Sequence, residues 1–282
     1  MANPIADPLV ELPDTSPSSE LVRIEATQAG AVTVVLDRPQ QANAFDADLI
    51  SALTEALETL RGAEGVRVVF LRGAGGTFSA GADAERLRAG LDNSEADHRE
   101  DVLAMARMLK MVWDLPMLTV ALVEGAAFGG GAGLAAACDI AIATRAASFS
   151  VSGVQLGLVP AVIAPYLVAA VGPRAARALF ATGRTFDADE AQSLGLVTEL
   201  VPNATALEAV RARIASESMA CAPGAVAASK KLVGDIFAHP IDHGLVEETA
   251  RRMASARMSA EGQEGVRAFV EGRKPEWTPG EA

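Results

Sequence analysis

The sequence of 282 residues has little of what disulfide-bonded or nucleic-acid-binding proteins require. Two cysteines cannot build a disulfide framework in a chain of this length, and such sparse usage suits a reducing compartment. Lys and Arg number 24 against 36 Asp and Glu, a net charge of -12, which disfavours a nucleic-acid surface. There is no secretory apolar segment and no unbroken apolar run of membrane length, so we expect a cytoplasmic protein without a membrane partner.

Apolar residues are abundant and follow patterns typical of alternating strands and helices. They make up 50% of the chain, which is ample for one large domain with a helical extension. Residues 1–19 hold four prolines among Asp, Ser and Glu without periodicity, so we expect a flexible lead-in. Apolar runs at 21–27 and 31–36 predict a hairpin that turns at 28–30. Asp46 precedes an apolar stripe at helical spacing, which predicts a core helix.

The second half of the sequence becomes progressively helical. A short strand is predicted at 148–151, and helices are predicted over 174–181 and 185–195. From Asn203 to about Gly272 the pattern is helical, and we expect this region to contact neighbouring subunits because one exposed layer could not hide its apolar positions. Those positions are Val210, Ile214, Leu232, Ile236 and Phe269.

Two stretches each pass from an apolar strand through glycines into a helix. In the first, the strand at 119–123 is followed by Gly129, Gly130 and Gly131, which open a small-residue helix. In the second, the strand at 66–72 leads through 73–83 into a helix. The first N–H groups of a helix have no intrahelical partner, and glycine lets a ligand approach the backbone closely. Each turn can therefore donate one backbone N–H to a single oxygen, as in an oxyanion hole.

The residues around these turns resemble those of the enoyl-CoA hydratase/isomerase (crotonase) family over about residues 20 to 275. The resemblance is carried by the motifs at 36–44, 79–83, 125–131, 138–140 and 156–160. It implies an α/β fold, a crotonase-like spiral of ββα units over 20–202 that holds the acyl-CoA site. A C-terminal helical oligomerisation region would follow at 203–282, giving a homotrimer or a dimer of trimers. Coenzyme A would enter as part of the thioester substrate, with no permanently bound cofactor and no metal.

The resemblance also assigns roles to particular residues. The N–H groups of Ala82 and Gly130 would form the oxyanion hole. The coenzyme A portion would lie along two neighbouring segments, the loop at 38–43 and the turn at 80–84. The family often has Lys at the position of Gln40, so phosphate binding there would lack a cation. The residues expected to contact coenzyme A are Gln40, Gln41, Ala42, Ala80, Asp83 and Ala84.

The sequence departs from the family's hydratases at the two residues that carry proton transfer. Those enzymes place one Glu on the small-residue helix and another after the short strand, and the pair holds a water and moves its protons. Here the two positions are Gly133 and Gly153. The methylglutaconyl-CoA hydratase-like branch, which the sequence resembles most, also has Gly at the first position, so the loss of the second Glu is the more serious change. Losing one general acid or base typically costs 10²–10⁴-fold in rate, so ordinary hydration should be weak. We expect Glu at both positions to restore it.

The sequence is compatible with several hypotheses for the proton-transfer group and the reaction. A larger or branched acyl group, or an acid from elsewhere, would fill the space that Gly133 leaves. Water or a bound anion such as bicarbonate could transfer protons, or His98 or a loop acid in 92–101 could support isomerisation, decarboxylation or thioester hydrolysis. A non-catalytic acyl-CoA-binding oligomer is the alternative from another class. Met105, Leu109 and Val112 form a stripe that lines an acyl tunnel or packs in the core.

Overall fold

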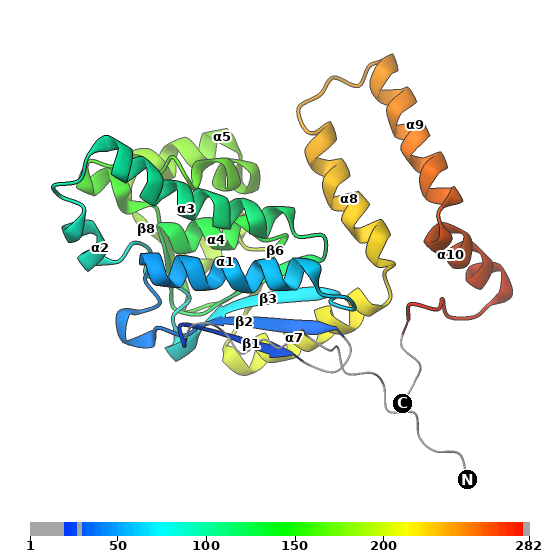
Figure 1. Cartoon of the computed structure of the whole chain (residues 1–282), viewed down its shortest axis with the longest axis horizontal. Helices are drawn as coiled ribbons and strands as arrows, with labels where there is room; N and C mark the ends of the chain where they lie inside the picture. Colours follow the sequence, from blue (N-terminus) through cyan, green and yellow to red (C-terminus); the bar gives the residue numbers. More distant parts are fainter. Residues whose placement is uncertain (1–19, 27–29, 279–282) are drawn as a thin grey trace, which may run out of the picture.

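The structure, a computed structural model, describes residues 20–26 and 30–278 and is built on a six-stranded sheet. The strand order is β1-β2-β3-β4-β6-β9, with β1 antiparallel to β2 and the later neighbours parallel (Figure 1). All six residues of β2 are buried, as expected of a strand covered on both faces. The strands are β1 Val22–Ala26, β2 Ala31–Leu36, β3 Val68–Gly73, β4 Leu118–Val123, β6 Ile140–Thr144 and β9 Glu199–Val201.

A second, three-stranded sheet lies beside the first, and only one of its strands was predicted from the sequence. It comprises β5 Ala126–Phe128, β7 Ser148–Ser150 and β8 Thr185–Asp187, in the order β5-β7-β8. The chain passes from β4 in the large sheet to β5 in the small one through Glu124 and Gly125, so successive strands turn from one sheet to the other. All three strands have three residues; β7 was predicted, whereas β5 and β8 were not.

Helices cover both faces of the large sheet, and the alternation of β3 shows how. Val69 and Leu71 face the main core with α1 and α3, whereas Val68 and Phe70 face α7. Asp46 caps α1 as predicted, its side chain accepting a hydrogen bond from the N–H of Leu49. The helices of this part are α1 Ala47–Gly62, α2 Ala84–Ala89, α3 Glu95–Asp114, α4 Gly130–Ala137, α5 Ala164–Thr182, α6 Ala188–Ser193 and α7 Ala204–Met219.

Two helix boundaries differ from the predictions. The helix predicted over 185–195 begins at Ala188, because β8 takes 185–187 and the side chain of Asp187 caps α6. The helix predicted from 174 belongs to α5, which begins at Ala164 and is interrupted at Gly172, where φ is 74°. Only glycine adopts that conformation readily, so the kink hid the continuity of the helix. The predicted lead-in at 1–19 and the hairpin residues 27–29 lie outside the described residues.

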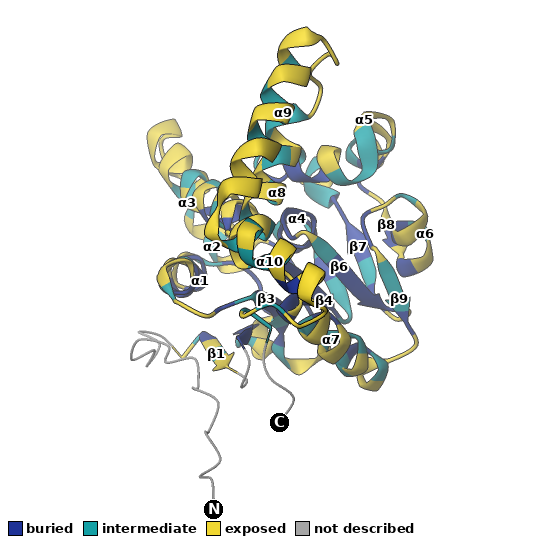
Figure 2. Cartoon of the chain, turned by 90° about the vertical axis from the view of Figure 1, so that its right-hand side faces the viewer, coloured by how far each residue is buried: buried dark blue, intermediate teal, exposed yellow. Residues whose placement is uncertain are grey.

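The C-terminal helical region is confirmed, but its apolar residues divide into two groups. Ile214 of α7 is buried against the sheet of its own chain, so the expectation that it faces a neighbour is wrong, and Val210 is partly buried beside it. Phe269 is exposed, and the helices α8 to α10 extend away from the core (Figures 1 and 2). These helices are α8 Pro223–Ile236, α9 His243–Met258 and α10 Ala260–Glu271. Within the described part of the chain, no helix is both long and apolar enough to cross a membrane.

One arginine ties the loop at 38–46 to the start of α2. Arg38 Nη1 lies 2.6 Å from Asp83 Oδ2 and its Nη2 lies 3.0 Å from Asp46 Oδ2. Asp83 also caps α2, its Oδ1 accepting hydrogen bonds from the N–H groups of Glu85 and Arg86. The hydrogen bond from Arg38, together with these backbone donors, lowers the pKa of Asp83 below its ordinary value of 3.8.

We predict that Asp83→Asn lowers the free energy of unfolding at pH 7 by about 1–3 kcal/mol, because Arg38 loses the nearer of its two charged partners. The folded-state pKa of Asp83 lies below its unfolded value, so its contribution is present above the unfolded pKa. That contribution disappears as the pH falls through the folded pKa. Urea unfolding at pH 7 and at about pH 3 should therefore show a smaller difference in acid. Asp48→Asn in the first turn of α1 is the matched control, and an equal loss at both pH values would contradict the prediction.

Candidate active site

Two strand-to-helix turns are joined by a short parallel pairing. Ser79 in the turn after β3 pairs with Ala127 of β5. The N–H of Ser79 donates to the carbonyl of Ala126, and the N–H of Phe128 donates to the carbonyl of Ser79, each at 2.9 Å. Because the pairing is parallel, both segments run on in the same direction and start their helices, α2 and α4, side by side.

Glycines allow the two turns to touch beyond this pairing. A Cβ at Gly81 would lie 2.7 Å from the carbonyl oxygen of Phe128, and one at Gly131 would lie 2.6 Å from that of Ser79. Gly81 also has φ of 91°, which side chains rarely tolerate. A larger residue at either position would push the turns apart.

Both turns contain a backbone N–H without an acceptor in the described part of the chain. Phe45 pairs with Ala82 through its own N–H to the Gly81 carbonyl and through the N–H of Asp83 to the Phe45 carbonyl. The N–H of Ala82 takes no part in this pairing, and Gly130 is the first residue of α4, where no intrahelical acceptor exists. Within residues 20–26 and 30–278, neither N–H donates a hydrogen bond.

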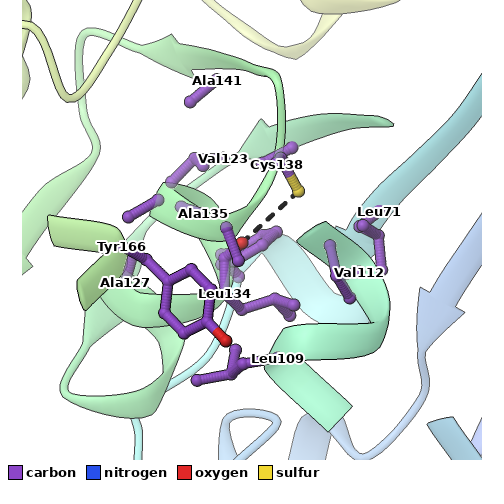
Figure 3. Packing of buried hydrophobic residues seen from close by; sticks show 14 of the residues in the cluster. Leu71, Leu109, Val112, Val123, Ala127, Leu134, Ala135, Cys138, Ala141 and Tyr166 are labelled. Carbon is purple, nitrogen blue, oxygen red and sulfur yellow. Dashed lines mark hydrogen bonds between the residues drawn. The ribbon is translucent and has the colours of Figure 1, made fainter. Parts of the chain in front are cut away.

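Ala82 and Gly130 both line one cavity of about 440 Å³. Its lining within the described chain is apolar or glycine except for Arg86, Asn93, His98 and Asp101, which come from α2, α3 and their connection. His98, the candidate for proton transfer, is on this lining, whereas Arg86 was not singled out, because its position depends on how α2 packs. Met105 lines the cavity, whereas Leu109 and Val112 are core residues beside Leu134 (Figure 3).

The two glycines at the predicted Glu positions differ in their surroundings. A Cβ at Gly133 would overlap Cγ2 of Ile163 and lie 2.7 Å from its Cβ, so Ile163 already fills the space above this residue. The expectation that an acyl group or an acid fills it is therefore wrong, and a Glu cannot be added there without moving Ile163. Gly153 lines the cavity, and a Cβ there would lie no closer than 3.6 Å to its nearest neighbour, the carbonyl oxygen of Leu158.

The residues predicted to contact coenzyme A lie on two adjoining segments. The N–H of Ala80 donates to the carbonyl of Ala42 at 2.9 Å, which joins the loop to the turn. Gln40 and Gln41 lie in an exposed 3-10 helix, η1 Pro39–Gln41, next to Ala42. Ala84 begins α2, and the carboxylate of Asp83 is engaged with Arg38 and the helix cap. Asp83 thus has no free carboxylate to offer a ligand, and its N–H is hydrogen-bonded to the carbonyl of Phe45.

Two other reactive groups belong to the core. Cys138 is buried and its Sγ–H donates to the carbonyl of Leu134, while burial raises the pKa of the thiol far above its ordinary value (Figure 3). Tyr166 is buried beside Trp113, with ring centroids 5.6 Å apart. Among the described residues, no cluster of three or more His, Cys, Asp or Glu could hold a metal ion.

Comparisons with known proteins agree on one family. The enoyl-CoA hydratase/isomerase family model matches residues 26–280. Enoyl-CoA hydratase ACTT6 of Alternaria alternata is 32% identical over 250 residues, which cover 88% of this chain and 80% of that protein. The solved structure of an enoyl-CoA hydratase from Shewanella pealeana has a TM-score of 0.88 and 37% identity, covering 91% of this chain and 96% of that one.

A second solved structure, an enoyl-CoA hydratase from Mycobacterium smegmatis, has a TM-score of 0.85 and 34% identity and covers 93% of this chain and all of that one. These likenesses extend over the two sheets, the paired turns and the helical region together. The chain therefore has the crotonase fold and belongs to the enoyl-CoA hydratase/isomerase family of enzymes.

Proposed function

We propose that the chain binds an acyl-CoA thioester whose carbonyl oxygen accepts hydrogen bonds from the N–H groups of Ala82 and Gly130. The observation that carries this proposal is that two free donors, from two turns held together by hydrogen bonds, border the same cavity. When a proton leaves or joins the carbon next to the carbonyl, negative charge builds up on that oxygen. Fixed donors stabilise this charge without reorganising, which is the largest catalytic contribution in many enzymes.

The coenzyme A portion of the substrate would leave the cavity past Ala82 and lie along the joined loop and turn. This places Gln40, Gln41, Ala42, Ala80, Asp83 and Ala84 along its path. Exposed glutamines provide uncharged donors there, so we expect contact with phosphate to come from amide and backbone groups rather than from a lysine. In this proposal coenzyme A is part of the substrate, and the chain holds no permanently bound cofactor.

Proton transfer would not follow the two-carboxylate scheme of the family's hydratases. Gly133 and Gly153 stand at the positions of the two Glu residues, and Ile163 closes the first of them. The ionisable groups among the described lining residues are Arg86, His98 and Asp101, all on the α2–α3 side of the cavity. We therefore propose an enoyl-CoA hydratase/isomerase whose ordinary hydration of crotonyl-CoA is slow, with enolate stabilisation as its main catalytic asset.

We also propose that α8 to α10 form the contacts of a homotrimer, or of a dimer of trimers, and close part of the coenzyme A site. This region exposes large apolar side chains on all three helices and on the α8–α9 connection. A patch of this kind on a lone chain marks an interaction surface. The exposed residues are Val233, Phe237, Ile241, Val246, Met253, Met258, Val266, Phe269 and Val270.

Light scattering at micromolar concentration should therefore find an assembly and no stable monomer. The double variant Phe237→Asp/Phe269→Asp should shift the assembly toward the monomer, because it puts charge into the apolar contact. Val168→Asp, an exposed residue of α5, is the control for adding charge. A wild-type chain that stays monomeric would contradict the proposed assembly.

Binding tests the oxyanion hole directly. Calorimetry should show that acetoacetyl-CoA binds at least about tenfold more tightly than S-butyl-CoA, a thioether without the carbonyl oxygen, because two hydrogen bonds are lost. Ala82→Pro removes one donor and should reduce this preference. Ala204→Pro, at the first position of α7 where proline is tolerated, is the control. Equal binding of the two ligands by the wild type would contradict the proposed geometry.

The two glycine positions should respond differently to Glu. Gly153→Glu should raise crotonyl-CoA hydration, by up to about 10²–10⁴-fold, because its side chain has room in the cavity. Gly133→Glu should not raise it, and should destabilise the chain, because Ile163 occupies the space. The absorbance of the enoyl thioester reports the reaction, and Gly62→Glu, with open space around it, is the matched control.

Fast hydration by the wild type, independent of bicarbonate, would contradict the proposed loss of the hydratase machinery. A wild-type rate that rises with bicarbonate would instead identify a bound anion as the base. The two results separate cleanly because the same assay is run with and without the anion.

A further inference from the structure

The charged part of the cavity consists of one ion pair. Arg86 of α2 and Asp101 of α3 line the cavity, and Arg86 Nη2 lies 2.6 Å from Asp101 Oδ1. Arg86 Nε donates to the same oxygen at 2.9 Å, and Nη2 also donates to the main-chain carbonyl of Asp101 at 3.1 Å. On the far side of the guanidinium, Nη1 donates to the carbonyl of Phe45 at 3.3 Å. The guanidinium is thus held from three directions.

The arginine is the less accessible member of this pair. The side chain of Arg86 is 18% exposed, against 40% for Asp101. A poorly hydrated cation needs a nearby anion, and Asp101 supplies it. With the pair intact, the α2–α3 side of the cavity carries no net charge apart from any on His98, the remaining ionisable group of the described lining.

Most of the remaining lining is apolar. The segment from Val151 to Ile163 contributes Leu158, Val159 and Val162, and α2 and α3 add Leu87, Val102 and Met105. An uncharged aliphatic chain would remove this surface from water, which is favourable by about 0.8 kcal/mol for each buried CH₂ group. An acyl group that ends in a carboxylate would bury a charge against this apolar surface. Its carboxylate would also compete with Asp101 for the guanidinium of Arg86.

We infer that Asp101 is a specificity-determining residue: by cancelling the charge of Arg86, it makes the cavity select uncharged acyl chains over acyl chains that carry a carboxylate. This inference rests on the proposed function, because it takes the cavity as the acyl site of a CoA ester. The inference also argues against a methylglutaconyl-type substrate, whose acyl group carries a free carboxylate in addition to the thioester. The sequence resemblance to that branch would then reflect Gly133 and its neighbours rather than the substrate.

The test compares hexanoyl-CoA with glutaryl-CoA, whose acyl groups have similar length and differ in charge. Calorimetry is run at about pH 8, where histidine side chains are ordinarily neutral. The wild type should bind hexanoyl-CoA at least about tenfold more tightly. Asp101→Asn leaves Arg86 without its anion, so the preference should fall at least about tenfold, mainly through tighter binding of glutaryl-CoA.

Two further variants separate charge from structure. Asp114→Asn removes an acid that is ion-paired with Lys110 on the same helix, outside the cavity, and should leave the preference unchanged. The double variant Arg86→Gln/Asp101→Asn removes both charges and should bring the preference for hexanoyl-CoA back. If the role of Asp101 were merely structural, Asp101→Asn would weaken the binding of both ligands equally. Adding Arg86→Gln would not reverse that loss.

The outcomes are distinguishable from a failure of the proposed function. If acetoacetyl-CoA, hexanoyl-CoA and glutaryl-CoA all fail to bind, the acyl-CoA proposal is contradicted, and so is this inference, which depends on it. If the esters bind but the wild type does not discriminate, or if Asp101→Asn keeps the wild-type preference, the inference alone is overturned. A lowered preference in Asp101→Asn that the double variant restores supports it.

Discussion

The close approach of two backbones at Gly81 and Gly131 is the constraint on which the rest of the site depends. Neither position has room for a Cβ, because each faces a carbonyl oxygen of the opposite turn. The short pairing of Ser79 with Ala127 fixes the direction in which both segments leave their strands. The N–H groups of Ala82 and Gly130 then border the same cavity as a consequence of backbone geometry. No side chain is needed to aim them, so the donors are as rigid as the sheets that carry them.

Much of the fold could be predicted because its signals are local. The stripe of α1 and its cap at Asp46, the buried strand β2, and the glycines of the two turns are each readable from a few neighbouring residues. The paired turns were predicted because each is a strand that ends in glycines before a helix. The free N–H of Gly130 follows from the same local rule, since the first residues of a helix lack intrahelical acceptors. Ala82 precedes α2 by two residues, and its free N–H depends instead on how the turn pairs with Phe45.

The parts that escaped prediction depend on contacts between distant residues. Strands β5 and β8 are three residues long, and they exist because β7 lies between them. The burial of Val210 and Ile214 depends on α7 packing against the sheet, whereas α8 to α10 have the same kind of sequence and stay exposed. The pairing of Arg86 with Asp101 requires α2 and α3 to be folded against each other. Helical periodicity shows that a face is apolar, but not what covers it.

The contact between Gly133 and Ile163 also sets the order in which the site can change over evolutionary time. The two residues lie thirty positions apart in the sequence, and the branched side chain of Ile163 occupies the space where a side chain at 133 would begin. Any larger residue at 133 is disfavoured until 163 becomes smaller, and a smaller residue at 163 leaves a void until 133 is filled. Each single change passes through a less stable protein, so the two positions are coupled. Gly153, with open space beside it, has no such partner among its nearest neighbours and is free to change in one step.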